Sequence, residues 1–242
     1  MTNIYSVLLT GFICLFLWIF IFKQSYSNTY IKNRISLIIS SVFGISPSYS
    51  YSVFATFLYC ILPTISCFVV AGIADIRISD LFSLNDIPIS TVIIMLGIVA
   101  SMSLISMFVM IAMKIVPKID IVGEMSSVVW IKGVFQVPKK IAWLLPFLSA
   151  SFEELFFRGV LLKSLISNGM NIILAISVVT LAFVLNQVLL TNTITQALVL
   201  GFSSIFISVI GSILFLASGS IIPSMIVHAS FAGFYVNKNE LD

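Results

Sequence analysis

Long apolar runs dominate this sequence and limit the folds that are open to it. Runs such as Ile4 to Phe22 and Thr91 to Met113 contain the ~20 residues that an α-helix needs to cross the hydrocarbon core of a bilayer. A spanning helix also pairs its own backbone polar groups, which a lipid environment demands. The sequence therefore predicts an all-α fold, a polytopic transmembrane helical bundle.

The composition supports this fold class and excludes others. Of the 242 residues, 60% are hydrophobic and 9% are charged, with a mean hydropathy of +1.19, whereas soluble domains are ~45–50% apolar and ~25% charged. The net charge of +3 is spread over several loops and forms no basic stripe. We therefore expect membrane lipid to surround the chain and no nucleic acid to bind it.

We predict about seven spans and one short extra helix. The spans are Ile4–Phe22, Tyr51–Ile73, Thr91–Met113, Ile141–Leu165, Asn171–Leu190, Ile194–Ala217 and Ile221–Val236. Residues 35–45 are apolar but short and dotted with serine, which is typical of an interfacial or re-entrant helix. No Lys or Arg precedes the first run, so we expect a retained helix there and not a signal peptide. Without repeats or linkers, residues 1–242 form a single predicted membrane domain.

Lysine distribution predicts the orientation of the chain. Basic residues concentrate in two segments, Lys23 to Arg34 and Lys114 to Lys140. Because cytoplasmic loops carry an excess of Lys and Arg, both segments are expected in the cytoplasm. The amino terminus would then lie outside and the carboxy terminus inside. An Ile- and Asn-rich chain without eukaryotic targeting features suggests a bacterial plasma membrane.

Two carboxylates and a guanidinium interrupt the fourth predicted span. Glu153, Glu154 and Arg158 lie within an apolar run, and ionisable residues at that depth indicate a functional site by default. Glu154 and Arg158 are four residues apart, so they share a helix face and can pair, while Glu153 is free to face a cavity. The alternative is a buried ionic lock that fixes helix packing without any chemistry.

Later spans add polar side chains that could surround these charges. His228, the only histidine, lies in the last span, and Asn186 and Gln187 are adjacent amides in the fifth. Each also has a structural interpretation, as a buried histidine that is hydrogen-bonded or as amides that bond between helices. Cysteines at positions 14, 60 and 67 show no metal-binding spacing and are expected to pack as small apolar residues.

Small residues recur on one side of the sixth predicted span. They are Gly201, Ser203, Ser204, Ser208, Gly211 and Ser212. Small residues let membrane helices approach closely, so we expect a packing face. The alternative is that this face lines a substrate groove.

The ordered motifs resemble those of the CAAX-protease and bacteriocin-processing family of intramembrane proteases. They are Glu153-Glu154-x-x-x-Arg158, Phe183-x-x-x-Gln187, and a small-residue turn followed by proline and His228. The resemblance covers about residues 140–236, and residues 1–140 add nothing to it. It implies an intramembrane endopeptidase with a family-specific core at residues 141–236.

The resemblance also implies roles for individual residues. Glu153 would activate water, Glu154 and Arg158 would support it, and His228 would stabilise the water or the oxyanion. The chain departs from the family where Gln187 replaces a histidine and Ala232 replaces an asparagine. Gln187 or Asn186 could supply the missing oxyanion donor.

The cofactor stays open at this point, because a divalent metal is often assigned to the family. Glutamine is a poor ligand for divalent metals, so a zinc site would have to use Glu153, Glu154 and His228.

Three functions remain open from the sequence. The leading one is hydrolysis of a membrane-associated, prenylated or leader peptide or protein substrate. The second is a catalytically degenerate membrane-protein partner, such as a bacteriocin-immunity protein or a regulator or chaperone. The third, a transporter or channel, is disfavoured because no inverted repeat is visible.

Overall fold

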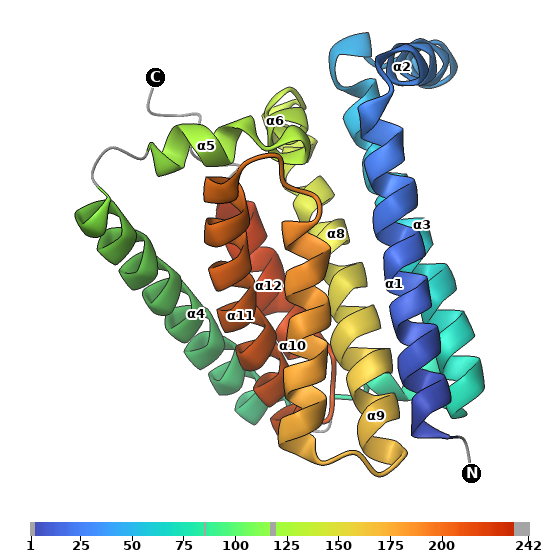
Figure 1. Cartoon of the computed structure of the whole chain (residues 1–242), viewed down its shortest axis with the longest axis vertical. Coiled ribbons are helices and arrows are strands. Elements are labelled where there is room, and N and C mark those ends of the chain that lie inside the picture. The colour runs from blue at the N-terminus through green and yellow to red at the C-terminus, as the bar shows by residue number, and fades with distance from the viewer. Residues whose placement is uncertain (1–2, 85, 117–119, 235–242) are drawn as a thin grey trace.

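The computed structural model describes residues 3–84, 86–116 and 120–234, and these ranges form a bundle of helices (Figure 1). In chain order the helices are α1 (Ile4–Ser27), α2 (Thr29–Phe43), α3 (Pro47–Ala74), η1 (Ile78–Phe82), α4 (Ile87–Ile115), α5 (Ile121–Ser127), α6 (Val129–Phe135), α7 (Lys139–Ala142), α8 (Leu144–Glu154), η2 (Leu155–Leu162), α9 (Lys163–Ser167), α10 (Ile172–Val188), α11 (Ile194–Ser218) and α12 (Ile222–Phe234). The predicted fold class, an all-α membrane bundle, is confirmed.

Helices α8, η2 and α9 run through the middle of the bundle. The α1–α3 pair packs on one side of them, and α10, α11 and α12 pack on the other, with α4 outermost against α11 and α12 (Figure 1). All eight residues of η2 are buried. Large apolar side chains on the outer faces of α1, α3 and α4 are exposed instead, as expected for surfaces that face lipid.

Four helices, α1, α3, α4 and α11, are long and apolar enough to cross a membrane. The apolar helices α10 and α12 are shorter over their described residues. The expected span Ile141–Leu165 is divided among α7, α8, η2 and α9, and it carries four charged side chains, those of Glu153, Glu154, Arg158 and Lys163. With several apolar helices in one bundle, the chain is a multi-pass membrane protein.

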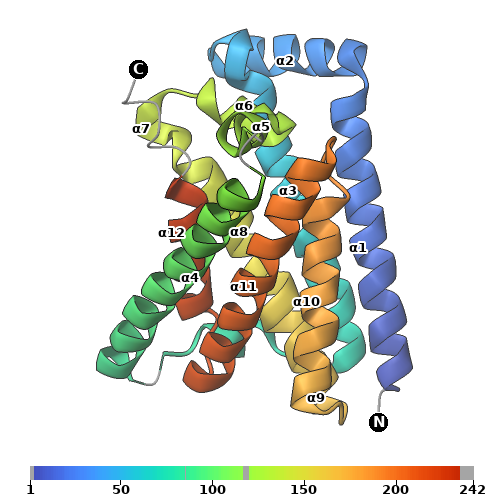
Figure 2. The same ribbon diagram turned by 60° about the vertical axis from the view of Figure 1, so that its left-hand side comes forward.

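Both lysine-bearing segments lie at the same end of the bundle. Helix α2 lies across this end of the bundle, and α5 and α6 lie at the same end (Figure 2). The short helix expected at residues 35–45 is therefore found as α2, which begins earlier, at Thr29, after the cap Asn28. Its position across the helix ends fits an interfacial helix and not a re-entrant one.

Helices α5 and α6 lie where the sequence suggested only a polar connection. Their buried residues Ile121, Met125, Val128 and Ile131 pack against Val199 and Leu200 at the start of α11. Gln196 of α11 adds two hydrogen bonds, from Nε2 to the Glu124 carbonyl at 3.2 Å and to Ser127 Oγ at 2.9 Å. This apolar face, at spacings of three and four residues, is the signal that the sequence contained.

Aromatic side chains join the central helix to α1 and α3. The Trp18 ring contacts Tyr59 at 5.0 Å between centroids and both Phe156 and Phe157 at 5.9 Å. Phe157 in turn contacts Phe183 of α10 at 5.1 Å. Such pairs add to the stability gained from burying the rings themselves. They also fix the rotation of the central helix, on which the charged residues lie.

Candidate functional site

The charged residues lie where the central helix changes type. Glu153 and Glu154 are the last two residues of α8, and Arg158 lies in the π-helix η2 that follows. Single π-helical turns occur often at functional sites, because they alter the direction of neighbouring side chains. Glu154 and Arg158 are fully buried, and Glu153 is 4% exposed.

Arg158 and Glu154 form a buried ion pair. Arg158 Nη1 lies 2.9 Å from Glu154 Oε1, but the guanidinium has no acceptor with hydrogen-bond geometry among the described residues. Its carbon lies instead over the Phe183 ring, 4.3 Å from the centroid. A guanidinium on an aromatic face is stabilised by the ring quadrupole. The pair thus corresponds to the ionic lock that the sequence suggested.

His228 lies between the two glutamates. Its Nδ1 is 2.9 Å from Glu154 Oε1, and its Nε2 is 3.6 Å from Glu153 Oε2. The ring is held edge-on against Phe183 at 5.5 Å. When the imidazole is protonated, both nitrogens donate, one toward each carboxylate. Two glutamates then face two cations, Arg158 and His228, and the buried charges balance.

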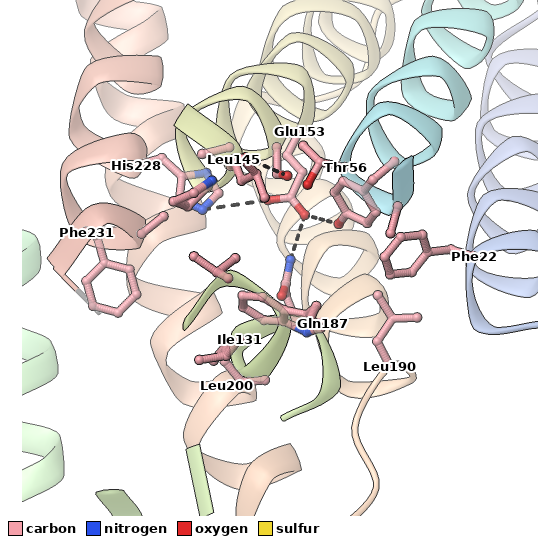
Figure 3. Close-up of a pocket in the computed structure, with 18 of the residues that line it drawn as sticks. Phe22, Thr56, Ile131, Leu145, Glu153, Gln187, Leu190, Leu200, His228 and Phe231 are labelled. Carbon is pink, nitrogen blue, oxygen red and sulfur yellow. Dashed lines mark hydrogen bonds and ion pairs between the residues drawn. The ribbon is translucent and has the colours of Figure 1, made fainter. Parts of the chain in front are cut away.

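Three donors hold one oxygen of Glu153. Glu153 Oε1 accepts hydrogen bonds from the Tyr59 hydroxyl, from Asn186 Nδ2 at 3.0 Å and from Gln187 Nε2 at 2.7 Å. Figure 3 shows Glu153 between His228 and Gln187. The other oxygen, Oε2, faces His228. Oε1 therefore fixes the carboxylate in place, while Oε2 is directed toward His228.

A cavity of about 120 Å³ lies beside Glu153. Glu153, Gln187 and His228 line it (Figure 3), and so does Ala232. Most of the remaining wall is apolar, with aromatic side chains from α1, α6 and α12: Phe22, Tyr26, Trp130, Phe135 and Phe231. An apolar chamber with a few convergent polar groups is typical of a ligand site.

The small-residue face of α11 contributes both to helix packing, as expected, and to the wall of the cavity. Ser203 and Ser204 line the cavity, whereas Gly201 packs against Val188 and Ser208 hydrogen-bonds to Thr180 at 2.9 Å. The face is therefore partly a groove wall and partly a packing surface.

Gly211 allows α11 to approach the buried ion pair. A Cβ at this position would lie 3.2 Å from Glu154 Oε2 and 3.3 Å from Arg158 Nε. We expect Gly211→Val to lower the free energy of unfolding by about 1–3 kcal/mol, because overpacking displaces the fixed charges. Thermal unfolding in detergent measures the effect. Gly72→Val on α3 is the matched control, since a Cβ there meets nothing within 4 Å; equal losses in both would contradict the prediction.

The structure brings together all five side chains singled out from the sequence: Glu153, Glu154, Arg158, Gln187 and His228. Asn186 joins them and donates to both Tyr59 and Glu153, whereas Gln187 donates one hydrogen bond, to Glu153. Sequence reasoning missed Tyr59 and the aromatic residues of α6. A tyrosine in an apolar span carries no pattern that marks it as functional, whereas α6 had a detectable apolar face.

The proposed zinc ligands do not fit a metal ion. Arg158 and the His228 Nδ1 both face Glu154 Oε1, which leaves Glu153 Oε2 and His228 Nε2 as the side-chain atoms directed toward one point. Structural and catalytic zinc sites use at least three protein ligands. Within the described ranges no group of three or more His, Cys, Asp or Glu side chains could hold a metal. Cys14, Cys60 and Cys67 are free thiols in the apolar helices.

Comparison with known proteins identifies the carboxy-terminal part of the chain. Residues 137–234 match the family described as Type II CAAX prenyl endopeptidase Rce1-like. No curated protein and no solved structure gives a match. The matched range includes Glu153, Glu154, Arg158, Gln187 and His228, and it begins close to the position where the motif resemblance began. The chain therefore carries an Rce1-like domain of the CAAX-protease family at residues 137–234.

Proposed function

We propose that the chain is an integral-membrane peptidase that hydrolyses a membrane-associated peptide or protein, with Glu153 as the base that activates water. One observation carries the proposal: the Glu153 carboxylate lines the cavity together with His228, and its Oε2 lies 3.6 Å from His228 Nε2. A general base must be within reach of the proton that it takes, and a group bound at this point would lie within reach of both atoms.

In this mechanism Glu153 takes a proton from water while the water oxygen attacks the peptide carbonyl carbon. The tetrahedral intermediate then loses its amine when the C–N bond breaks, and Glu153 returns the proton to the leaving nitrogen. Protonated His228 would stabilise the negative oxygen of the intermediate through Nε2, because donors directed at developing charge account for much of enzyme catalysis. Glu154 holds His228 through Nδ1, and Arg158 balances the charge of Glu154.

The proposal includes an orientation. The lysine-bearing segments lie at the end of the bundle that carries α2, α5 and α6, and basic loops favour the cytoplasmic face. The cavity extends from Glu153 to α6, whose residues Trp130, Ile131, Val134 and Phe135 line it. Substrate would therefore enter from the cytoplasmic leaflet of a plasma membrane, bacterial by composition.

The test is cleavage by the full chain reconstituted in liposomes. The probes are a peptide anchored by a lipid-modified cysteine near its carboxyl end, the same peptide without the lipid, and an apolar leader-type peptide. Mass spectrometry detects the new ends, and Glu153→Gln protein gives the background. Product from at least one probe above that background is the expected result. Equal product from the parent and the variant would overturn the proposal.

A second candidate function is a catalytically inactive membrane-protein partner, for example an immunity protein or a regulator. The arrangement of Gln187 favours it, because its amide is engaged by Glu153 Oε1 at 2.7 Å and a neutral amide cannot act as an acid or base. This function predicts that a membrane-protein partner co-purifies in stoichiometric amount. It also predicts that Glu153→Ala protein keeps its full biological function in cells, since no catalytic base is needed. Loss of function in that variant would exclude it.

A further inference from the structure

Tyr59 reaches the candidate site from outside the segment that matches the family. It lies in α3 (Pro47–Ala74), whereas the match covers residues 137–234. Its hydroxyl donates to Glu153 Oε1 and accepts a hydrogen bond from Asn186 Nδ2 at 2.9 Å. Asn186 Nδ2 also donates to Glu153 Oε1 at 3.0 Å. The three side chains thus form a closed network around one carboxylate oxygen.

Helix α1 fixes the direction in which this hydroxyl points. The Tyr59 ring meets Trp18 at 5.0 Å and Phe22 at 4.7 Å, both edge to face, and Trp18 is fully buried. A ring held by two aromatic neighbours has little freedom to rotate away from its hydrogen-bond partner. The hydroxyl position is therefore set by packing before any substrate binds, as a precise site requires.

We propose that Tyr59 is a positioning residue for the hydrolytic reaction. By fixing Glu153 Oε1, its hydroxyl keeps the carboxylate in the orientation that directs Oε2 toward His228. The assignment rests on the proposed peptidase function. It also makes α1 and α3 part of the site, so the Rce1-like segment alone lacks one of the groups that hold its reactive carboxylate.

The same helix offers a matched control. Tyr51 lies eight residues earlier in α3, is buried, and donates its hydroxyl to the Ser25 carbonyl at 2.5 Å. It does not line the cavity beside Glu153. Replacing either tyrosine by phenylalanine removes one hydroxyl and one donated hydrogen bond while keeping the ring. A purely structural role of Tyr59 would appear as a loss of stability, whereas a positioning role lowers kcat in protein that is still folded.

The experiment compares Tyr59→Phe, Tyr51→Phe and Glu153→Gln in the full reconstituted chain, with kcat and KM measured on the peptide cleaved by the parent. We expect Tyr59→Phe to lower kcat about ten- to a hundredfold, since a hydrogen bond to a charged group is among the stronger ones, and to change KM by less than about twofold. Tyr51→Phe should keep the parent kcat. Thermal unfolding should show that both variants are folded, with the larger shift for Tyr59→Phe, because this variant loses a hydrogen bond to a charged group and the acceptor of the Asn186 hydrogen bond.

Each outcome bears on a definite claim. If Glu153→Gln is inactive and Tyr59→Phe matches the parent, the positioning role is wrong and the proposed function stands. If Glu153→Gln matches the parent, the proposed function itself fails. If Tyr59→Phe unfolds, Trp18→Phe replaces it, because Trp18 orients the Tyr59 ring without lining the cavity. For Trp18→Phe, which acts through the Tyr59 ring, a few-fold loss of kcat at unchanged KM supports the role, and an unchanged kcat overturns it.

Discussion

Replacement of Glu153 by glutamine is expected to lower the rate of peptide cleavage by roughly 10²–10⁴-fold, which is the usual contribution of a general base. Glutamine has the same shape, and its amide oxygen can still accept the hydrogen bonds that Tyr59, Asn186 and Gln187 donate to Glu153 Oε1. Only the atom directed toward His228 loses its ability to accept a proton. The measurement is single-turnover cleavage in liposomes, which separates chemistry from product release.

Glu124→Gln is the matched control for this substitution. Glu124 lies on α5 outside the cavity, where Oε2 accepts a hydrogen bond from Thr193 at 2.8 Å. Its replacement should leave cleavage unchanged. Thermal unfolding should show Glu153→Gln protein to be as stable as the parent within a few degrees. A variant that is folded and retains more than about a tenth of the parent rate would show that Glu153 is not the base.

Arg158→Met is expected to lower the free energy of unfolding by about 3–5 kcal/mol, because it removes the fixed positive charge from a buried cluster that holds two carboxylates, Glu153 and Glu154. Methionine occupies a similar length in the helix and keeps an apolar contact with the Phe183 ring, which the guanidinium carbon meets at 4.3 Å. The loss therefore reports the charge and not a cavity. Thermal or denaturant unfolding in detergent measures it.

Two further variants identify the origin of this loss. Arg77→Met removes a guanidinium from an exposed position before η1 and should change stability by less than about 0.5 kcal/mol. Combining Arg158→Met with Glu154→Gln removes both charges and should recover a large part of the stability, since a neutral pair carries a smaller desolvation penalty. A double variant as unstable as Arg158→Met alone would contradict the ion-pair explanation.

The long apolar runs predicted the bundle because a helix of about 20 apolar residues is stable in lipid without further contacts. The runs that became α1, α3, α4 and α11 satisfied this requirement on their own, so their positions followed from hydropathy. Helices α5 and α6 are seven residues each, too short to be stable alone. They form because their apolar face packs against α11, and that contact depends on the tertiary structure.

The charged part of the site was predictable for a different reason. Glu153, Glu154, Arg158 and His228 are expensive in an apolar environment, so their presence marked the place where helices must converge. The geometry between them was not predictable, since it depends on the π-helix after Glu154 and on how α12 approaches α8. Tyr59 could not be predicted as part of the site, because a tyrosine in an apolar helix needs only one hydrogen-bond partner for its hydroxyl and is common in membrane spans.

His228 contacts both the ion pair and the proposed base. A substitution at His228 would therefore alter the packing of the ion pair and the proposed base together. Replacing Glu154 and Arg158 by apolar residues of similar volume could stabilise the fold, but the imidazole would then lose the carboxylate that holds its Nδ1. The proposed reaction would be lost even though the protein remained folded.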